Sequence, residues 1–600
     1  MILNKKSLIV LFSIVSANLY ADDFFTLPEY KVIDNNFVNM ASGNVSHSFT
    51  DVSIGGSLGL THTVSNAVHF NYFGMIKLVT IISEPTVMKV TGISNASFEI
   101  NIDDTFEPQS DLSTSLEFIQ GVGYIFTTQD GTEITYDTSV EITSVGQTAW
   151  MTKIVKPNGL TIKIAASNRP SNMGFGYMLN VSTNSGYQLK YKYSNSWPIT
   201  DGEKSIVYSG VYWPQIAPKS VVGINSAVEY CTATTSTCSL TNNWPTTTYN
   251  WLNGQTSEDS IFTATDPLGR VLEYHFKAID EAYTASNGHV IISPETYVVK
   301  LIEIKEFSSD DVSVTYDYAH DFLGRTEAQM RNFQYRSQLR TAHRVGFSQT
   351  YDTNETNTQY HRMMHFSGGH KAIEHVYSDL TVGAPTEIQT VDKVINFEQS
   401  YTNKLTQIVD RFNRADQTFD YDSRGNLTHK HQFSDNRTSF VTTQASYPTT
   451  CANRKTCNRP TWTKDAKGNQ TDYTYHTQSG QTATITQHAN EDGKRRQVRY
   501  EYVEKFATYK INSSTPSVSP DGIWLLDRES YCINSNYVGS SCAGNDEVVT
   551  QYVYEPSNLQ LIGVAVTAAG KTLRTCYRYD IYGNQIGETK PKANLSACSY

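Results

Sequence analysis

The chain has 600 residues, which is too many for one hydrophobic core, so we expect several domains or a repeat array. Its formal net charge is −11, and no run of basic residues offsets that charge, which argues against a nucleic-acid partner. With 38 Tyr, 36 Gly and 18% charged residues, the composition favours half-exposed strands joined by turns over helices.

Residues 1–21 have the pattern of a secretory signal peptide. Lys5 and Lys6 precede an apolar run (8–15) that ends in small residues. We expect cleavage after Ala21, with Ala17 as second choice and an uncleaved anchor as the remaining alternative. The run is too short for a permanent membrane span, and no later stretch reaches that length. The mature protein is therefore predicted to be exported, and to be either secreted or held at the cell surface.

Residues 22–110 read as a β-rich opening domain. A Gly43-Asn44 turn leads into an alternating strand (49–54), a Gly55-Gly56 break and a second strand (58–64), which together predict an antiparallel hairpin.

Residues 111–259 read as degenerate hairpins. Asp130-Gly131 and Asn158-Gly159 stand between alternating segments and predict tight hairpin turns. Residues 186–193 alternate so that the side chains of one face are Tyr187, Leu189, Tyr191 and Tyr193. A less regular insert (214–255) contains two cysteines, and we interpret it as a disulfide-tied loop.

Residues 260–600 contain a recurring segment, Asp-x-x-Gly followed by Asn or Arg. Two copies are also preceded by Tyr. The residues that define the copies are Asp266 and Gly269; Asp321 and Gly324; Tyr421, Asp422 and Gly425; Asp465 and Gly468; Tyr579, Asp580 and Gly583.

The recurring segment has the chemistry of a turn. The Asp side chain can accept a hydrogen bond from the backbone two residues later, and Gly supplies the positive φ that closes the turn. Strand-forming residues flank most copies, so each unit is predicted to be strand, turn, strand. The copies are unevenly spaced, which suggests degenerate copies between them.

Eight cysteines fall into neighbouring pairs. An even count at short spacing in an exported chain favours local disulfides, with zinc ligation and free thiols as the weaker alternatives. The predicted pairs are Cys231 with Cys238, Cys451 with Cys457, Cys532 with Cys542, and Cys576 with Cys598.

No residue is nominated as catalytic, as a metal ligand or as a cofactor ligand. His361 and His365 have the spacing of a zinc protease, but Arg362 stands where a catalytic Glu is required. Two alternating strands around Gly368-Gly369 explain this segment more simply. No motif for a nucleophilic serine or a phosphate loop occurs, so we do not expect an enzyme, and a secreted hydrolase is the weakest of three hypotheses.

On the motifs at Tyr421-Asp422 and Tyr579-Asp580 and on the opening segment, the chain resembles the Rhs/YD-repeat proteins of secreted bacterial type. The resemblance implies an all-β fold in which repeated strand-turn-strand hairpins form a coiled, curved β-sheet shell. It also implies a toxin at the C-terminal end. The family's end-of-shell region has no counterpart here, so we expect the array to be truncated or continued beyond Tyr600.

The first hypothesis is a secreted scaffold, part of a β-shell that encapsulates or presents a C-terminal toxin that this chain does not contain. The alternative is a cell-surface carbohydrate-binding or adhesion protein, whose Tyr-rich face contacts glycans or other cell surfaces. The expected partners are thus a toxin domain or further repeats beyond residue 600, with no cofactor, no nucleic acid and no membrane span after signal removal.

Overall fold

The computed structural model describes most of the second half of the chain and a set of segments in the first half. The described residues are Phe37, 47–65, 69–70, 75–79, 87–91, 96–100, 105–108, 113–137, 148–166, 178–192, 207–208, 211–212, 218–232, 238–252, 259–284, 290–308, 311–320, 326–330, 335–341, 360–367, 371–377, 393–397, 405–409, 415–434, 438–591 and 595–598.

The described part of the chain is built from β-strands, with one 3-10 turn, η2 (Gly56–Leu58), and no α-helix. The all-β prediction is confirmed. In this part of the chain, no helix has the length and apolar character needed to cross a bilayer.

The N-terminal strands form a small sheet and a short branch. The small sheet contains β1 (Ser48–Ile54), β2 (Leu60–Ser65) and β3 (His69–Phe70), and the branch contains β4 (Met75–Val79), β5 (Val87–Thr91), β6 (Ala96–Ile100) and β7 (Phe106–Pro108).

Eleven strands form what we call the first tier. They are β8 (Ser115–Ile119), β9 (Gly123–Thr127), β10 (Glu133–Asp137), β11 (Thr148–Val155), β12 (Thr161–Ala166), β13 (Met178–Thr183), β14 (Tyr187–Lys192), β17 (Ser220–Asn225), β18 (Thr246–Leu252), β19 (Asp259–Thr265) and β20 (Val271–Thr284).

Connecting strands follow the first tier. They are β21 (Val290–Ser308), β22 (Asp311–His320), β23 (Thr326–Met330), β24 (Tyr335–Thr341), β25 (Tyr360–Ser367), β26 (Lys371–Tyr377), β27 (Lys393–Phe397) and β28 (Leu405–Val409).

The remaining wall strands form what we call the array. They are β29 (Ala415–Tyr421), β30 (Leu427–Phe433), β31 (Phe440–Ser446), β32 (Trp462–Lys464), β33 (Gln470–Tyr475), β34 (Thr482–Ala489), β35 (Arg495–Lys505), β38 (Ile523–Cys532), β41 (Glu547–Tyr554), β42 (Leu561–Ala568), β43 (Lys571–Tyr579) and β44 (Gln585–Glu588). Three small ribbons stand apart: β15 (Val207–Tyr208) with β16 (Val211–Tyr212), β36 (Thr508–Tyr509) with β37 (Ser517–Val518), and β39 (Tyr537–Val538) with β40 (Ser541–Cys542).

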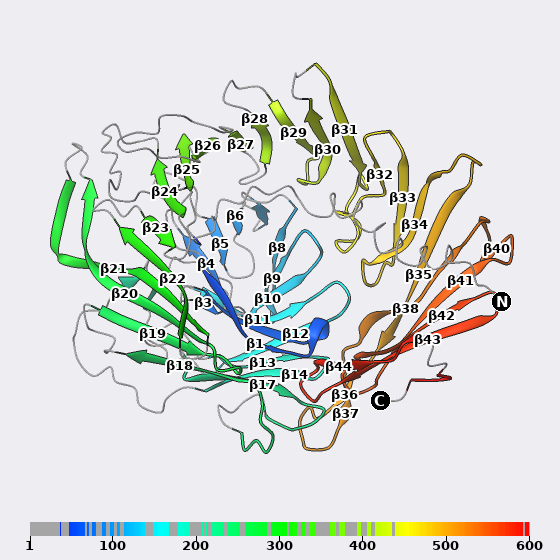
Figure 1. Cartoon of the computed structure of the whole chain (residues 1–600), viewed down its shortest axis with the longest axis horizontal. Coiled ribbons are helices and arrows are strands. Elements are labelled where there is room, and N and C mark those ends of the chain that lie inside the picture. The colour runs from blue at the N-terminus through cyan, green and yellow to red at the C-terminus, as the bar shows by residue number, and fades with distance from the viewer. Residues whose placement is uncertain are drawn as a thin grey trace.

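One hydrogen-bonded ladder runs from β8 through the first tier, the connecting strands and the array to β44. Neighbours in this ladder are antiparallel except β24 and β25, which pair in parallel, and the branch joins it where β4 pairs with β11. The ladder bends into a curved wall, and β1 runs across the space that the wall partly surrounds (Figure 1). The predicted curved sheet is therefore present.

The N-terminal hairpin β1–β2 packs on the first tier and forms the centre of the largest buried cluster. Tyr187, Leu189 and Tyr191 line one face of β14, as the alternation predicted, and they are buried on the same side as the hairpin. Tyr193 lies outside the described residues. The cluster continues to Phe419 at the start of the array, so one apolar core joins hairpin, first tier and array.

Candidate functional site at the rims of the wall

Four of the predicted turns share one hydrogen-bond pattern. One carboxylate oxygen of the Asp accepts the N–H groups of the third and fifth turn residues at 2.8–2.9 Å. The Gly has a φ between 77° and 86°, which favours glycine. The turns with this pattern begin at Asp266, Asp422, Asp465 and Asp580. The turn at Asp321 and Gly324 lies outside the described residues.

The fifth turn residue explains why Asn or Arg follows the glycine. The side-chain amides of Asn426, Asn469 and Asn584 donate to the second carboxylate oxygen at 2.8–3.0 Å. Arg270 makes the same contact through Nε at 2.6 Å. Each turn therefore supplies three hydrogen bonds to its own Asp from residues within the turn.

One further copy escaped the sequence pattern because it begins with Asn. Asn490 Oδ1 accepts the Lys494 N–H at 2.8 Å, and Gly493 has a φ of 74°. The signal that could have found it is Asn-x-x-Gly-Lys, with Asn as the neutral equivalent of Asp.

The turns of the array lie on two opposite rims, because successive antiparallel strands reverse direction. The turns of Asp422 and Asp580 follow β29 and β43, and we call their side the seam rim. The turns of Asp465 and Asn490 follow β32 and β34 and lie on the far rim. The uneven spacing of the sequence motif thus mixes two sets of turns.

A β-bulge lies near most of the strand reversals at the seam rim. The strand register shifts next to a tyrosine at five positions, which are Tyr421, Tyr475, Tyr502, Tyr554 and Tyr579. Only two of them precede Asp, so sequence reasoning found the Tyr-Asp pair and missed the wider rule. Bulges bend a strand and increase its twist, and here the bend recurs on one side of the sheet.

These tyrosines also connect neighbouring hairpins. Tyr502 donates its hydroxyl to the Thr482 carbonyl at 2.7 Å, and Thr482 is the residue that pairs with Tyr475 at the register shift. Tyr554 bonds the Leu526 carbonyl at 2.8 Å in the same manner. The hydroxyls of Tyr447 and Tyr579 do so as well, at 3.0 and 2.8 Å.

Burial of the tyrosines follows from this arrangement. It raises the pKa of Tyr554 to about 12, and it raises the pKa of Tyr502 further. Tyrosine hydroxyls are protonated at physiological pH in any case, and here they act as donors. We call the set Tyr447, Tyr502, Tyr554 and Tyr579 the tyrosine ladder.

The seam rim lies against the turns of the first tier. Asn458 donates to the Gln129 carbonyl at 3.1 Å, and the Gln129 amide donates to Asn426 at 3.2 Å. The Trp524 N–H donates to the Asn158 carbonyl at 2.7 Å. We call this set of contacts between first-tier turns and the seam rim the seam.

Further contacts continue the seam along the rim. The Asn558 amide donates to the Ser185 carbonyl at 2.7 Å, across 373 positions of sequence, and Asn558 is buried. The Lys510 N–H donates to the Ser226 carbonyl at 3.0 Å. A Cβ on Gly159 would lie 2.6 Å from the Gly522 carbonyl oxygen, so close approach of the two backbones requires glycine there.

The Asp580 turn ends the seam and touches both the N-terminal hairpin and the insert. The Gly55 N–H donates to the Tyr582 carbonyl at 3.0 Å, and the Asn225 amide donates to the Ile581 carbonyl at 3.0 Å. The Tyr582 hydroxyl bonds the Asn243 carbonyl at 2.7 Å, and its ring packs edge-on against Trp244. The last described repeat therefore closes on the first described hairpin.

A buried glutamate organises the insert that receives this turn. Glu229 accepts hydrogen bonds from Trp244 Nε1 at 2.7 Å and from the backbone and hydroxyl of Thr241 at 2.6 and 2.8 Å. Burial disfavours the ionised carboxyl, but the bonds from Trp244, Thr241 and Asn242 outweigh it and lower the pKa of Glu229 to about 2.

A second buried polar group joins the N-terminal hairpin to the first tier. His62 Nδ1 lies 2.7 Å from Asp51 Oδ1, and both side chains are fully buried. The Tyr249 hydroxyl donates to the other Asp51 oxygen. Asp51 sits at a register shift of β1, which turns its carboxylate toward the wall.

All eight cysteines form disulfides, in the four pairs that their spacing suggested. The Cys451–Cys457 loop lies on the seam rim, where Lys455 approaches Gly131 of the first tier.

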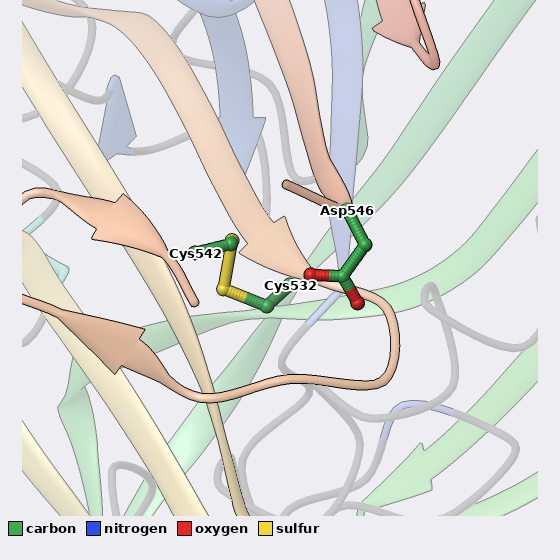
Figure 2. A group of neighbouring side chains, drawn as sticks. All are labelled: Cys532, Cys542 and Asp546. Atoms are coloured by element: carbon green, nitrogen blue, oxygen red, sulfur yellow. A yellow bond between two sulfur atoms is a disulfide. The ribbon is translucent and has the colours of Figure 1, made fainter. Parts of the chain in front are cut away.

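Among the described residues, Cys532, Cys542 and Asp546 lie close enough together to have the spacing of metal ligands as they stand (Figure 2). The two sulfurs of this group are bonded to each other, and thiolate is the form that binds metals. The Asp546 carboxylate accepts the N–H groups of Asn534 and Ser535 at 2.5 and 3.0 Å, and bonds led by the Ser535 hydroxyl lower its pKa. This group is therefore explained as a loop that a disulfide and hydrogen bonds to Asp546 hold in place.

The histidine segment forms two paired strands. His361 and His365 lie on β25 and His375 on β26, which pair antiparallel as expected.

No model of a known protein family and no curated protein matches the chain. Similar solved structures include the crystal structure of TcdB2-TccC3-TEV, with 12% identity and a TM-score of 0.26 over 91% of this chain and 36% of that one. The crystal structure of TcdB2-TccC3 without its hypervariable C-terminal region has 11% identity and a TM-score of 0.27 over 86% and 30%. The Photorhabdus luminescens Tc holotoxin pore with a mutated TccC3 has 11% identity and a TM-score of 0.24 over 86% and 32%. The chain thus spans about a third of the length of these chains.

Proposed function

We propose that the chain is an exported Rhs/YD-repeat scaffold, part of a β-shell that encloses or presents a toxin polypeptide lying outside residues 1–600. The observation that carries the proposal is the seam. Buried hydrogen bonds, such as that from Asn558 to Ser185, join the first tier to the array along their rims. A wall that encloses a polypeptide must be continuous in this way, whereas a binding module has no need to seal its rims.

The adhesion alternative rested on a Tyr-rich face that is free to stack on sugars. In the array, the hydroxyls of the tyrosine ladder donate to backbone carbonyls of neighbouring strands. The hydroxyls of these tyrosines thus bond other strands of the wall, which favours the scaffold over a sugar-binding face.

Limited proteolysis of the full-length gene product tests the proposal. A polypeptide encoded after Tyr600, or one that copurifies with the protein, should resist protease in the native protein. It should become cleavable when Asp580→Ala opens the end of the seam. Equal cleavage of that polypeptide in both proteins, or a purified product without any such polypeptide, would refute the enclosing role. Specific binding on a glycan array would support adhesion instead.

A further inference from the structure

Two histidines and one aspartate gather on the solvent-exposed face of β29 and β30. His429 and His431 are two residues apart on β30, so both side chains point to the same side of the sheet. Asp420, on β29, is directly opposite His429. The side chains of Asp420, His429 and His431 are 59%, 42% and 22% exposed. The hairpin between these strands is the Asp422 turn, which fixes their register.

The Asp420 carboxylate faces both rings. Its Oδ2 atom lies 3.3 Å from His431 Nε2 and 3.9 Å from His429 Nδ1. Ligand atoms around a tetrahedral zinc ion are about 3.4 Å apart, given bonds of about 2.1 Å. Two of the three ligand pairs are thus near coordination spacing.

Thr442 orients one of the rings. Its Oγ1 lies 2.8 Å from His431 Nδ1, and the two residues are directly opposite on β30 and β31. Nε2 is thereby directed toward Asp420. A hydrogen bond to the second ring nitrogen is the usual way in which proteins orient a metal-binding histidine. The rings of His429 and His431 are stacked, with their centroids 5.8 Å apart and an interplanar angle of 7°. The third ligand pair is therefore wider than coordination spacing, and the two rings must tilt toward each other to share one ion.

We propose that Asp420, His429 and His431 form a binding site for a divalent transition metal of the zinc class, held at the surface with an open coordination position. Two imidazoles and one carboxylate suit Zn²⁺, Ni²⁺ and Cu²⁺ rather than Mg²⁺ or Ca²⁺. The open position accepts water or a ligand from outside the chain. The site is independent of the proposed scaffold role, since it needs only the neighbouring strands β29, β30 and β31.

Equilibrium dialysis with Zn²⁺ alone tests the site on the full chain. The double variant His429→Gln, His431→Gln should bind one equivalent fewer than the unsubstituted protein at micromolar Zn²⁺. Asp420→Asn should weaken the same equivalent by about tenfold or more. His488→Gln removes another exposed strand histidine and should leave the number bound unchanged. Equal binding by the double variant and the unsubstituted protein would overturn the proposal.

A second measurement does not depend on the variants' folding. Diethylpyrocarbonate modifies accessible imidazole nitrogens, and peptide mass spectrometry locates the modified residues. Zn²⁺ should protect His429 and His431 in the unsubstituted protein and leave His488 reactive. Unchanged modification of His429 and His431 in the presence of Zn²⁺ would refute the site.

Discussion

Asp465 and Asp580 provide a matched pair for measuring the seam. Their turns have the same hydrogen bonds, but the Asp580 turn contacts Gly55 and Asn225, whereas the Asp465 turn is exposed on the far rim. Alanine at either position removes a carboxylate that accepts three hydrogen bonds. Because water replaces much of what is lost in an exposed turn, we expect each substitution to cost about 2 kcal/mol locally, which is the order of one hydrogen bond to a charged group.

Native-state hydrogen exchange distinguishes the two variants. The Gly55 amide donates to Tyr582 across the seam, so a loss of about 2 kcal/mol in the docked turn should speed its exchange by up to about 30-fold in Asp580→Ala. Asp465→Ala should speed exchange in its own turn and leave Gly55 unchanged. Unchanged Gly55 exchange in Asp580→Ala, or equal acceleration in both variants, would refute the view that this turn closes the wall.

Three further outcomes test other parts of the structure. Tyr502→Phe should lower the free energy of unfolding by about 1 kcal/mol in urea titrations, because it leaves the Thr482 carbonyl without its hydroxyl partner; Tyr577→Phe is the control, and equal effects would contradict the ladder. The pKa of Glu229 is lowered in the folded protein. The ionised carboxylate therefore stabilises the folded state fully above the ordinary pKa of 4.5, and this contribution is lost as pH falls toward about 2. Thermal melts should show this loss, and Glu229→Gln should flatten it; an identical pH profile would argue against the role of Glu229. Replacing Cys451 and Cys457 by serine should lower the free energy of unfolding by about 2 kcal/mol, measured by thermal unfolding. An unchanged melting temperature would show that the loop does not need its disulfide.

Local chemistry made the turns predictable. Asp422 and Gly425 carry their partners within five residues, so the sequence alone indicates the hydrogen bonds that form. The cysteine pairs were predictable for the same reason, since each bridge spans a short loop. In both cases the interaction is decided by residues that are close in the chain.

The seam and the ladder were not predictable, because their partners are far apart and are often backbone carbonyls. Nothing in the side chain of Ser185 or Thr482 marks its carbonyl as an acceptor. The rim on which a turn lies depends on the number of strands since the previous turn, and degenerate copies such as Asn490 conceal that number. Side-chain patterns therefore revealed the repeat but not the side of the sheet to which it belongs.

Curvature and closure follow from an unequal distribution of register shifts between the two rims of the array. The register shifts at Tyr475, Tyr502 and Tyr554 all lie toward the seam rim. The far rim has one shift, between Thr486 and Ala489 in β34, and otherwise tight turns such as that of Asp465. A sheet that receives an extra residue on one side at successive hairpins is bent toward one direction, because each bulge adds twist there. Repetition of the same bend coils the wall, and coiling brings the seam rim against the first-tier turns. The tyrosine hydroxyls bond backbone carbonyls at the preceding register shift, so tyrosines that lie at the shifts also join neighbouring hairpins.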